Sequence, residues 1–348
     1  MKNFFLNVLL LSMSVLVAVG VGELYFRLFD PQSIIPRYVE TSPYGIRKNI
    51  ANVRGMMLVP EYRHGFSTNS QGFRGTKEYS VPKPTGVYRI LVLGDSVTLG
   101  HGVEDEATFS SHIERQLSAH RRTEVINMGV SGFGTAEELI QLRNIGWQYD
   151  PDLVILTYFP NDPYNNVVSQ LFSVTDGKLI QKKETFVPAI YIRDRLYAIP
   201  GYSFLCQNSH LVNFIRNRAS GFFIGQLAQQ NSISSQTSQV LSQPEEELTM
   251  LLMDEMMREV EQHRVPLLIL NIPVVSKGNI ISNFPGKRIR EHASNVHIMD
   301  VNDTIYSRHG LSELSYEKDS HPRPFAHELI GKEVADFIQS KVWAFQKG

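Results

Sequence analysis

The stretch YRILVLGDS, residues 88–96, decides the fold. Its first six residues form an almost continuous apolar run, which is typical of a short strand buried on both faces of a sheet. The turn at 94–96 ends this strand, and a helical spacing of apolar residues follows over 109–120. A strand, a tight turn and a helix in this order predict the first unit of a parallel α/β sheet.

The same alternation continues toward the C-terminus. Further short apolar runs predict four more strands, at 124–128, 153–159, 266–272 and 296–299. Helical spacing predicts helices at 135–147, 244–263 and 325–342. For the first of these we expect Thr135 as the N-cap, with Glu138 as its capping-box partner. Strands and helices that alternate in this way form a parallel sheet whose two faces are both covered by helices.

Two parts of the chain depart from this rhythm. Residues 31–87 are rich in Pro, Gly, Asn and Ser, and we interpret them as a stem and lead-in rather than a separate domain. The alternation of strands and helices is also interrupted at about 164–243, which predicts an insertion there. Within it we expect a helix that starts near Ser209 and a loop in the Gln- and Ser-rich tract 229–243. The expected division is therefore an anchor at 1–30, the lead-in at 31–87 and one α/β domain at 88–348.

The N-terminal segment indicates where the protein is located. Residues 4–22, FFLNVLLLSMSVLVAVGVG, contain no charge, and roughly 20 apolar residues are enough to cross a bilayer as a helix. Lys2 precedes this run and no excess of positive charge follows it, which predicts a cytoplasmic N-terminus and the body of the chain outside the cytoplasm, periplasmic or at the cell surface. A signal peptide cleaved near residues 18–20 is the alternative, and the protein would then be secreted.

Composition excludes several classes of protein. The formal net charge is -1 and the basic residues are scattered, so no nucleic-acid partner is predicted. Cys206 is the single cysteine, which excludes an intrachain disulfide. The eleven histidines include no metal-binding pair such as His-Glu-x-x-His, so we predict neither a metal nor another cofactor.

Residues that can carry chemistry follow the predicted strands. Ser96 follows the first strand, the glycine-rich loop 129–134 follows the second, and Asn161 follows the third. Asp319 and His321 lie beyond the fifth strand, just before the last helix. Parallel α/β sheets bind their ligands beyond the carboxyl ends of the strands. A serine hydroxyl becomes a strong nucleophile when a histidine removes its proton and a carboxylate orients that histidine.

These four blocks, in this order, resemble the SGNH/GDSL hydrolase family, over a region from about Tyr88 to the last helix without the insertion. The resemblance implies a flavodoxin-like three-layer α/β/α sandwich. It also implies a catalytic triad of Ser96, Asp319 and His321. The oxyanion hole that it implies consists of Ser96, Gly132 and Asn161.

The sequence departs from the family pattern at two points. One residue separates Asp319 from His321, where the family often has two, and Pro160 replaces the glycine that usually precedes the Asn block. The N-terminal helix and the segment Asn-Ser-Gln-Gly-Phe-Arg at 69–74 are similar to the membrane-anchored, exported branch of the family.

Three functions are compatible with this sequence. The first is a serine esterase that acts through an acyl-enzyme and removes acetyl or other small acyl groups from an envelope or secreted glycan. The second is an O-acyltransferase that uses the same triad. The third is a non-catalytic glycan-binding or assembly protein, against which the intact Ser96, Asp319 and His321 argue. The expected partners are an acylated carbohydrate or small ester and, through the N-terminal helix, a membrane.

Three further polar residues have a simpler structural interpretation. We expect His101 to be a solvated loop histidine, although it follows Ser96 closely. His327 is expected on the surface of the closing helix. Arg74 is expected to form a structural salt bridge rather than to bind substrate.

Overall fold

The computed structural model describes residues 2–187, 190–230, 240–289 and 295–343. Its centre is a sheet of five parallel strands: β5 (Tyr88–Leu93), β6 (Thr123–Asn127), β7 (Leu153–Tyr158), β10 (Leu267–Asn271) and β13 (Val296–Asp300). The strand order is β13-β10-β7-β5-β6. Counted along the chain this is the order 2-1-3-4-5, which is that of flavodoxin. The five predicted strands and the flavodoxin-like fold are confirmed.

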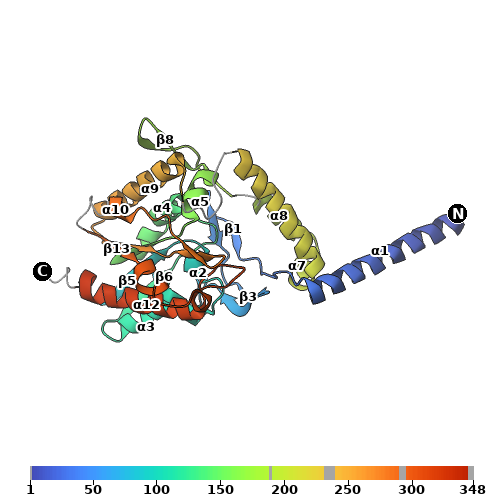
Figure 1. The fold of residues 1–348 in the computed structure, drawn as a ribbon, viewed down its shortest axis with the longest axis horizontal. Helices are drawn as coiled ribbons and strands as arrows, with labels where there is room; N and C mark the ends of the chain where they lie inside the picture. The colour runs from blue at the N-terminus through green and yellow to red at the C-terminus, as the bar shows by residue number, and fades with distance from the viewer. Residues whose placement is uncertain (1, 188–189, 231–239, 290–294, 344–348) are drawn as a thin grey trace.

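Helices cover both faces of this sheet, as Figure 1 shows. One face carries α3 (Phe109–Ser118) and α12 (Pro324–Phe337), and the other carries α4 (Thr135–Asn144) and α9 (Gln243–Gln262). Successive residues of β5 pack into these two cores in turn, because side chains alternate between the faces of a strand. The result is the predicted three-layer sandwich.

The start of α4 differs from the prediction by one residue. Its N-cap is Gly134, whose N–H donates to Glu137 Oε2 at 3.0 Å, so the predicted pair of Thr135 and Glu138 is wrong. Gly134 has extended backbone angles and ends the glycine-rich loop, and Thr135 is already inside the helix.

The lead-in is more ordered than a stem. It forms two antiparallel hairpins, β1 (Val39–Thr41) with β2 (Arg47–Asn49), and β3 (Arg54–Val59) with β4 (Tyr62–Ser67). Met57 and Phe66 are buried against Leu99, which belongs to the short helix that follows the first strand of the sheet. The second hairpin therefore packs directly on the edge of the sheet where the predicted site lies.

The insertion is mainly helical. It contains α5 (Asp162–Ser169), the hairpin β8 (Phe172–Thr175) with β9 (Lys178–Gln181), α6 (Ile190–Tyr197), α7 (Tyr202–Asn208) and α8 (His210–Gln230). The helix predicted from Ser209 is confirmed as α8. Most of the predicted Gln- and Ser-rich loop, residues 231–239, lies outside the described residues.

The N-terminal helix α1 (Lys2–Phe29) extends away from the rest of the molecule (Figure 1). Among the described residues it is the one helix that is long and apolar enough to cross a membrane, and none of its apolar stretch is buried.

The remaining short elements are α2 (Ser96–Leu99), β11 (Val274–Ser276), β12 (Asn279–Ile281), α10 (Gly286–Ile289), α11 (Leu311–Leu314), 3₁₀ turns Asp105–Ala107 and Gly146–Tyr149, and π turns Asn302–Tyr306 and Ile338–Val342.

Candidate active site

Ser96, His321 and Asp319 form one continuous chain of hydrogen bonds. Ser96 is the first residue of α2, directly beyond β5, and its Oγ lies 2.9 Å from His321 Nε2. His321 Nδ1 lies 3.1 Å from Asp319 Oδ1. A carboxylate on Nδ1 favours the tautomer that leaves Nε2 free to accept a proton from the serine. The structure thus brings together the three residues of the predicted triad, and the geometry suits removal of the Ser96 proton.

Asp95 links the serine turn to Asn161. Its Oδ1 accepts a hydrogen bond from the Val97 N–H at 2.8 Å, which caps α2. Its Oδ2 accepts one from Asn161 Nδ2 at 3.2 Å and lies 3.5 Å from Ser96 Oγ. Burial raises the pKa of the Asp95 carboxyl. The Asn161 amide is therefore next to Ser96, and its role as an oxyanion donor stays a prediction.

The glycine-rich loop packs closely on α2. A Cβ atom at Gly129 would lie 2.3 Å from the backbone nitrogen of Leu99, so this approach requires glycine. Gly132 has a φ of +76°, and its carbonyl accepts a hydrogen bond from Arg47. Arg47 also donates to the buried Glu137 at 2.8 Å. Arg47 of the lead-in thus binds the loop at Gly132. The role of Gly132 as an oxyanion donor stays a prediction.

Asp319 has a second partner that sequence analysis missed. The Tyr62 hydroxyl, from β4, donates a hydrogen bond to Asp319 Oδ2. Burial raises the pKa of Asp319, but hydrogen bonds from His321 and Tyr62 outweigh it and lower the pKa to about 2. Burial, with the nearby Asp319 charge, raises the pKa of Tyr62, which keeps its hydroxyl protonated as a donor. Tyr62 thus extends the hydrogen-bonded chain by one residue.

Glu61 holds the loop that carries the triad acid. Its carboxylate accepts hydrogen bonds from the backbone N–H groups of Glu317, Lys318 and Asp319, at 2.9, 2.7 and 2.8 Å. Ser320, between Asp319 and His321, has a φ of +62°, a conformation that non-glycine residues rarely adopt. Glu61 lies at the turn of the β3–β4 hairpin, and no local pattern in the sequence pairs this turn with a loop so far along the chain.

His101 belongs to the site, so its interpretation as a solvated loop histidine is wrong. It is buried, and its ring stacks on that of His321 with centroids 5.2 Å apart. Its Nε2 lies 3.0 Å from the Tyr38 hydroxyl and 2.9 Å from Ser131 Oγ. Burial, with the neighbouring His321, holds the pKa of His101 well below its usual range, which keeps it neutral. His101 therefore connects the glycine-rich loop to the triad histidine.

His327 and Arg74, the other two polar residues singled out in the sequence, have structural roles. His327 is fully buried, and its Nδ1 accepts the Phe109 N–H at 3.1 Å, so the surface position predicted for it is wrong. Burial lowers the pKa of His327 to about 3. It lies on the face of α12 that packs on α3, a position that apolar spacing alone does not reveal for a histidine. Arg74 forms the predicted structural salt bridge, with Asp105 at 3.0 Å.

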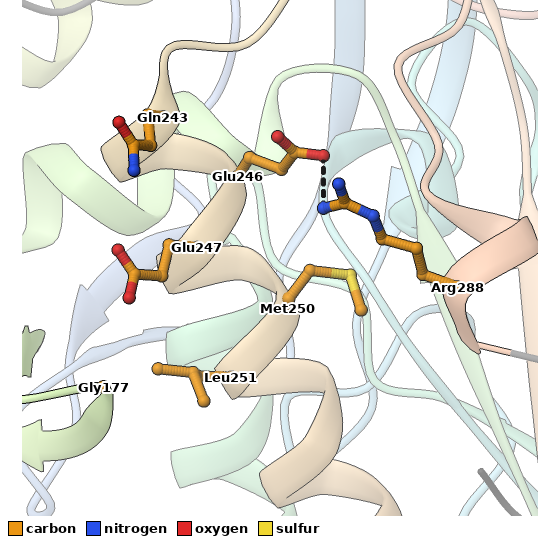
Figure 2. Close-up of a pocket in the computed structure, with 7 residues that line it drawn as sticks. All are labelled: Gly177, Gln243, Glu246, Glu247, Met250, Leu251 and Arg288. Atoms are coloured by element: carbon orange, nitrogen blue, oxygen red, sulfur yellow. Dashed lines mark hydrogen bonds and ion pairs between the residues drawn. The ribbon is translucent and has the colours of Figure 1, made fainter. Parts of the chain in front are cut away.

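Figure 2 shows a pocket of about 370 Å³ that lies outside this site. It is bordered by the first turns of α9 and by residues from two other segments: Gly177, Gln243, Glu246, Glu247, Met250, Leu251 and Arg288. Glu246 and Arg288 form an ion pair across it at 2.7 Å. Because none of its lining residues belongs to the triad, we do not assign it to the reaction. Among the described residues there is also no group of three or more His, Cys, Asp or Glu that could hold a metal ion.

No family model and no curated protein matches the chain. Similar solved structures include a two-domain esterase active on acetylated mannans, with 13% identity, 73% of this chain and 49% of that chain covered, and a TM-score of 0.40. A protein of the G-D-S-L family from Desulfitobacterium hafniense has 13% identity, 71% and 98% coverage and a TM-score of 0.39. The psychrotrophic esterase EstA from Pseudoalteromonas sp. has 16% identity, 73% and 98% coverage and a TM-score of 0.38.

One of these three structures is described as a member of the G-D-S-L family, and the other two are described as esterases. The chain spans about half of the two-domain esterase. At these identities and TM-scores the likeness supports no conclusion about the chemistry of this chain, which has to be argued from its own residues.

Proposed function

We propose that this chain is a serine esterase of the SGNH/GDSL type that works through an acyl-enzyme on Ser96. One observation carries the proposal: Ser96 Oγ, His321 and Asp319 form an uninterrupted hydrogen-bonded chain at the carboxyl edge of the sheet. This arrangement supports nucleophilic catalysis because each group stands within reach of the group it has to activate or orient.

The proposed reaction has two steps. His321 takes the proton of Ser96 as the hydroxyl attacks the ester carbonyl, and the protonated imidazole then gives that proton to the departing alcohol. The Ser96 and Gly132 N–H groups and the Asn161 amide stabilise the oxyanion that forms. His321 then takes a proton from a water molecule that attacks the acyl carbonyl, the bond between that carbon and Ser96 Oγ breaks, and His321 returns the proton to Ser96 Oγ as the acid is released. Loss of one oxyanion donor typically lowers turnover about a hundred- to a thousandfold.

The proposed substrate is an acetylated or otherwise acylated glycan of the cell envelope or a secreted glycan. Support comes from location: α1 is apolar, uncharged over 4–22 and unburied, which fits a membrane anchor or a signal sequence. Because Lys2 lies on the N-terminal side of this helix, which would face the cytoplasm, the anchor would place the catalytic domain outside it. An O-acyltransferase is the second candidate, because the acyl-enzyme reacts with whichever of water or a sugar hydroxyl reaches it. A non-catalytic glycan-binding protein is the third.

The first experiment is hydrolysis of p-nitrophenyl acetate by the full chain in detergent micelles. We expect the wild type to release p-nitrophenol and Ser96→Ala to lose nearly all of this activity. Ser307→Ala is the matched control, since Ser307 is exposed and its hydroxyl donates to the Asp303 carbonyl one turn earlier. A folded wild type no more active than Ser96→Ala would contradict the esterase proposal.

A second measurement separates hydrolysis from transfer. The acyl-enzyme is formed from p-nitrophenyl acetate in the presence of increasing concentrations of an acetyl-free glycan. An esterase yields acetate at an unchanged rate and no acetylated glycan. Acetylated glycan as the main product, formed by the wild type and not by Ser96→Ala, would favour the acyltransferase.

A further inference from the structure

The helices α6, α7 and α8 follow one another along the chain, each in contact with the next, and we call them the helical platform (residues 190–222). Its apolar side chains face outward to an unusual extent: Ile192 is 55% exposed, Leu196 36%, Ile199 53%, Phe204 67%, Leu205 46% and Ile215 59%. Exposed apolar side chains scattered singly are normal, but a gathering of this size on consecutive helices marks an interaction surface.

The platform is cationic, unlike the chain as a whole. Residues 190–230 contain four arginines, at 193, 195, 216 and 218, a single acidic residue, Asp194, and no lysine or glutamate. Asp194 is itself paired with Arg37 at 2.6 Å. Exposed apolar side chains and arginines are both groups that a membrane interface accommodates, because the apolar groups enter between the headgroups and the arginines meet lipid phosphates.

The platform is joined to α1 at the end of the uncharged run. The Glu23 carboxylate accepts the Ser209 hydroxyl at 2.7 Å and the backbone N–H groups of His210 and Leu211 at 3.1 and 3.0 Å. These are the free N–H groups of the first turn of α8, so Glu23 caps this helix. The rings of Phe26 and Phe214 stack with centroids 4.3 Å apart. α8 therefore begins at the level where α1 would leave a bilayer.

The direction of the helices fits a membrane surface. In Figure 1, α7 and the start of α8 lie at the base of α1, and α8 runs across the line of α1 rather than along it. A pocket of about 340 Å³ at this junction is lined by Asp30, Gln32, Phe214, Asn217 and Arg218. Arg218 lies over the Phe214 ring at 5.3 Å and has no ion pair among the described residues. Its charge is therefore available to a lipid phosphate.

We propose that the helical platform lies on the surface of an anionic phospholipid bilayer, the one that α1 crosses. Its apolar side chains enter between the headgroups, and the two arginines of α8, Arg216 and Arg218, bind phosphates. This inference rests on the membrane anchoring proposed above. Arg193 also donates to the Val39 carbonyl at 2.6 Å, in the same hairpin that supplies Arg47 to Gly132. Docking of the platform would thus hold the active site in a set orientation above the membrane.

Tryptophan quenching by brominated lipids tests this proposal. Phe204→Trp and Ile215→Trp variants of the full chain are placed in phosphatidylglycerol nanodiscs whose acyl chains are brominated near the headgroup. The wild type, with Trp147 and Trp343, gives the background emission. Phe325→Trp on α12, a partly exposed position at 40%, is the matched control, and Phe5→Trp reports on α1. We expect the added emission to be quenched at positions 204, 215 and 5 and not at position 325.

Each other outcome overturns the proposal. If the Phe204→Trp and Ile215→Trp variants behave like the control while Phe5→Trp is quenched, α1 is in the bilayer and the platform is not. If Phe5→Trp is also unquenched, the anchoring fails and the platform proposal with it. If the emission added at positions 204 and 215 is shielded from both the lipid bromines and aqueous acrylamide, another protein surface, such as a second copy of the chain, covers the platform.

The arginines have their own test. We expect stronger quenching in phosphatidylglycerol discs than in phosphatidylcholine discs, and we expect Arg216→Gln with Arg218→Gln to remove that difference. Equal quenching in both lipids overturns the role of the arginines. Ser96-dependent hydrolysis of p-nitrophenyl acetate is measured for every variant. It reports on folding and on the esterase proposal separately, because quenching does not depend on whether Ser96 is a nucleophile.

Discussion

At the scale of single residues, Asp319, the carboxylate of the proposed triad, is held by contacts from three residues. Asp319 contacts His321 through one oxygen and Tyr62 through the other, and Glu61 binds its backbone. A carboxylate fixed in this way orients the imidazole with little freedom. In the proposed mechanism Tyr62 and Glu61 are thus positioning residues, since they act through Asp319 and do not reach the reacting atoms.

We predict that Tyr62→Phe lowers kcat about tenfold or more with little change in KM. A hydrogen bond to a charged group contributes about 1.5–3 kcal/mol, and its loss frees the carboxylate to rotate away from His321. Steady-state kinetics with p-nitrophenyl acetate measure both constants. Tyr316→Phe is the control, because Tyr316 packs beside Tyr62 but donates its hydroxyl to the Gly102 carbonyl. Equal effects of the two variants would contradict the role of Tyr62.

The low pKa of Asp319 predicts a pH-dependent contribution to stability. Its pKa is lowered from 3.8 to about 2 in the folded protein, so its ionised form favours folding by at most about 2 kcal/mol above the unfolded pKa. This contribution is lost as the pH falls from about 4 through about 2. We therefore expect the difference in unfolding free energy between wild type and Asp319→Asn to shrink over this range. Denaturant titrations at several pH values measure it, and a constant difference would argue against the shift.

At the scale of elements, a hairpin from the lead-in holds the glycine-rich loop. Arg47 on β2 binds the Gly132 carbonyl and the buried Glu137 at the start of α4, so it joins three segments. Its guanidinium lies where a side chain at Gly132 would be, with Nη1 2.6 Å from the position of a Cβ atom. The loop is thus shaped both by its own backbone and by the cation packed on it.

We predict that Gly132→Ala lowers kcat/KM about tenfold to a hundredfold. The substitution strains a backbone with φ of +76° and displaces Arg47, which moves the N–H group proposed to bind the oxyanion. Gly86→Ala is the matched control, because Gly86 has nearly the same φ, +77°, and open space around it. We expect it to cost about 1–2 kcal/mol of stability with no loss of activity. Similar activities of the two variants would sink the proposed role of the loop.

At the scale of the whole molecule, the lead-in belongs to the same folded unit as the sheet. The β3–β4 hairpin buries Met57 and Phe66 on α2 and presents Glu61 and Tyr62 to the loop before α12. The first and last parts of the domain are therefore joined at the active site. A segment that contributes core residues unfolds together with the body rather than as an independent stem.

We predict that Met57→Ala lowers the free energy of unfolding by about 2–5 kcal/mol, as is usual when a buried methionine is removed. The neighbouring Met56 provides the control, because it is 40% exposed on the opposite face of β3, whereas Met57 is fully buried. Met56→Ala should change stability by about 0.5 kcal/mol or less. Thermal unfolding of the full chain in detergent, followed by near-UV circular dichroism, compares them. Indistinguishable variants would mean that the hairpin unfolds on its own.

The sequence was a good guide to the sheet and to the proximity of Ser96, Asp319 and His321, and a poor one to their surroundings. The strands could be predicted because each is an apolar run buried on both faces, and reactive residues at their ends meet at one edge by topology alone. The predicted positions of His101 and His327 were wrong, because polarity predicts exposure while both rings are buried by partners from distant segments. The cap of α4 was displaced by one residue because a glycine there takes the extended conformation that ends the loop.

What the sequence by itself determined is therefore the five parallel strands and the helices on the faces of their sheet, because local apolar patterns and the rules of chain connection suffice for these. The flavodoxin-like order and the meeting of Ser96, Asp319 and His321 were implied by the family resemblance of the motifs at the strand ends. Only the tertiary structure decided that Tyr62 bonds to Asp319, 257 residues away, and that Arg47 holds Gly132. The lead-in carries no hydrophobic periodicity or motif that specifies where it docks, so these contacts follow from how its hairpins pack on the sheet.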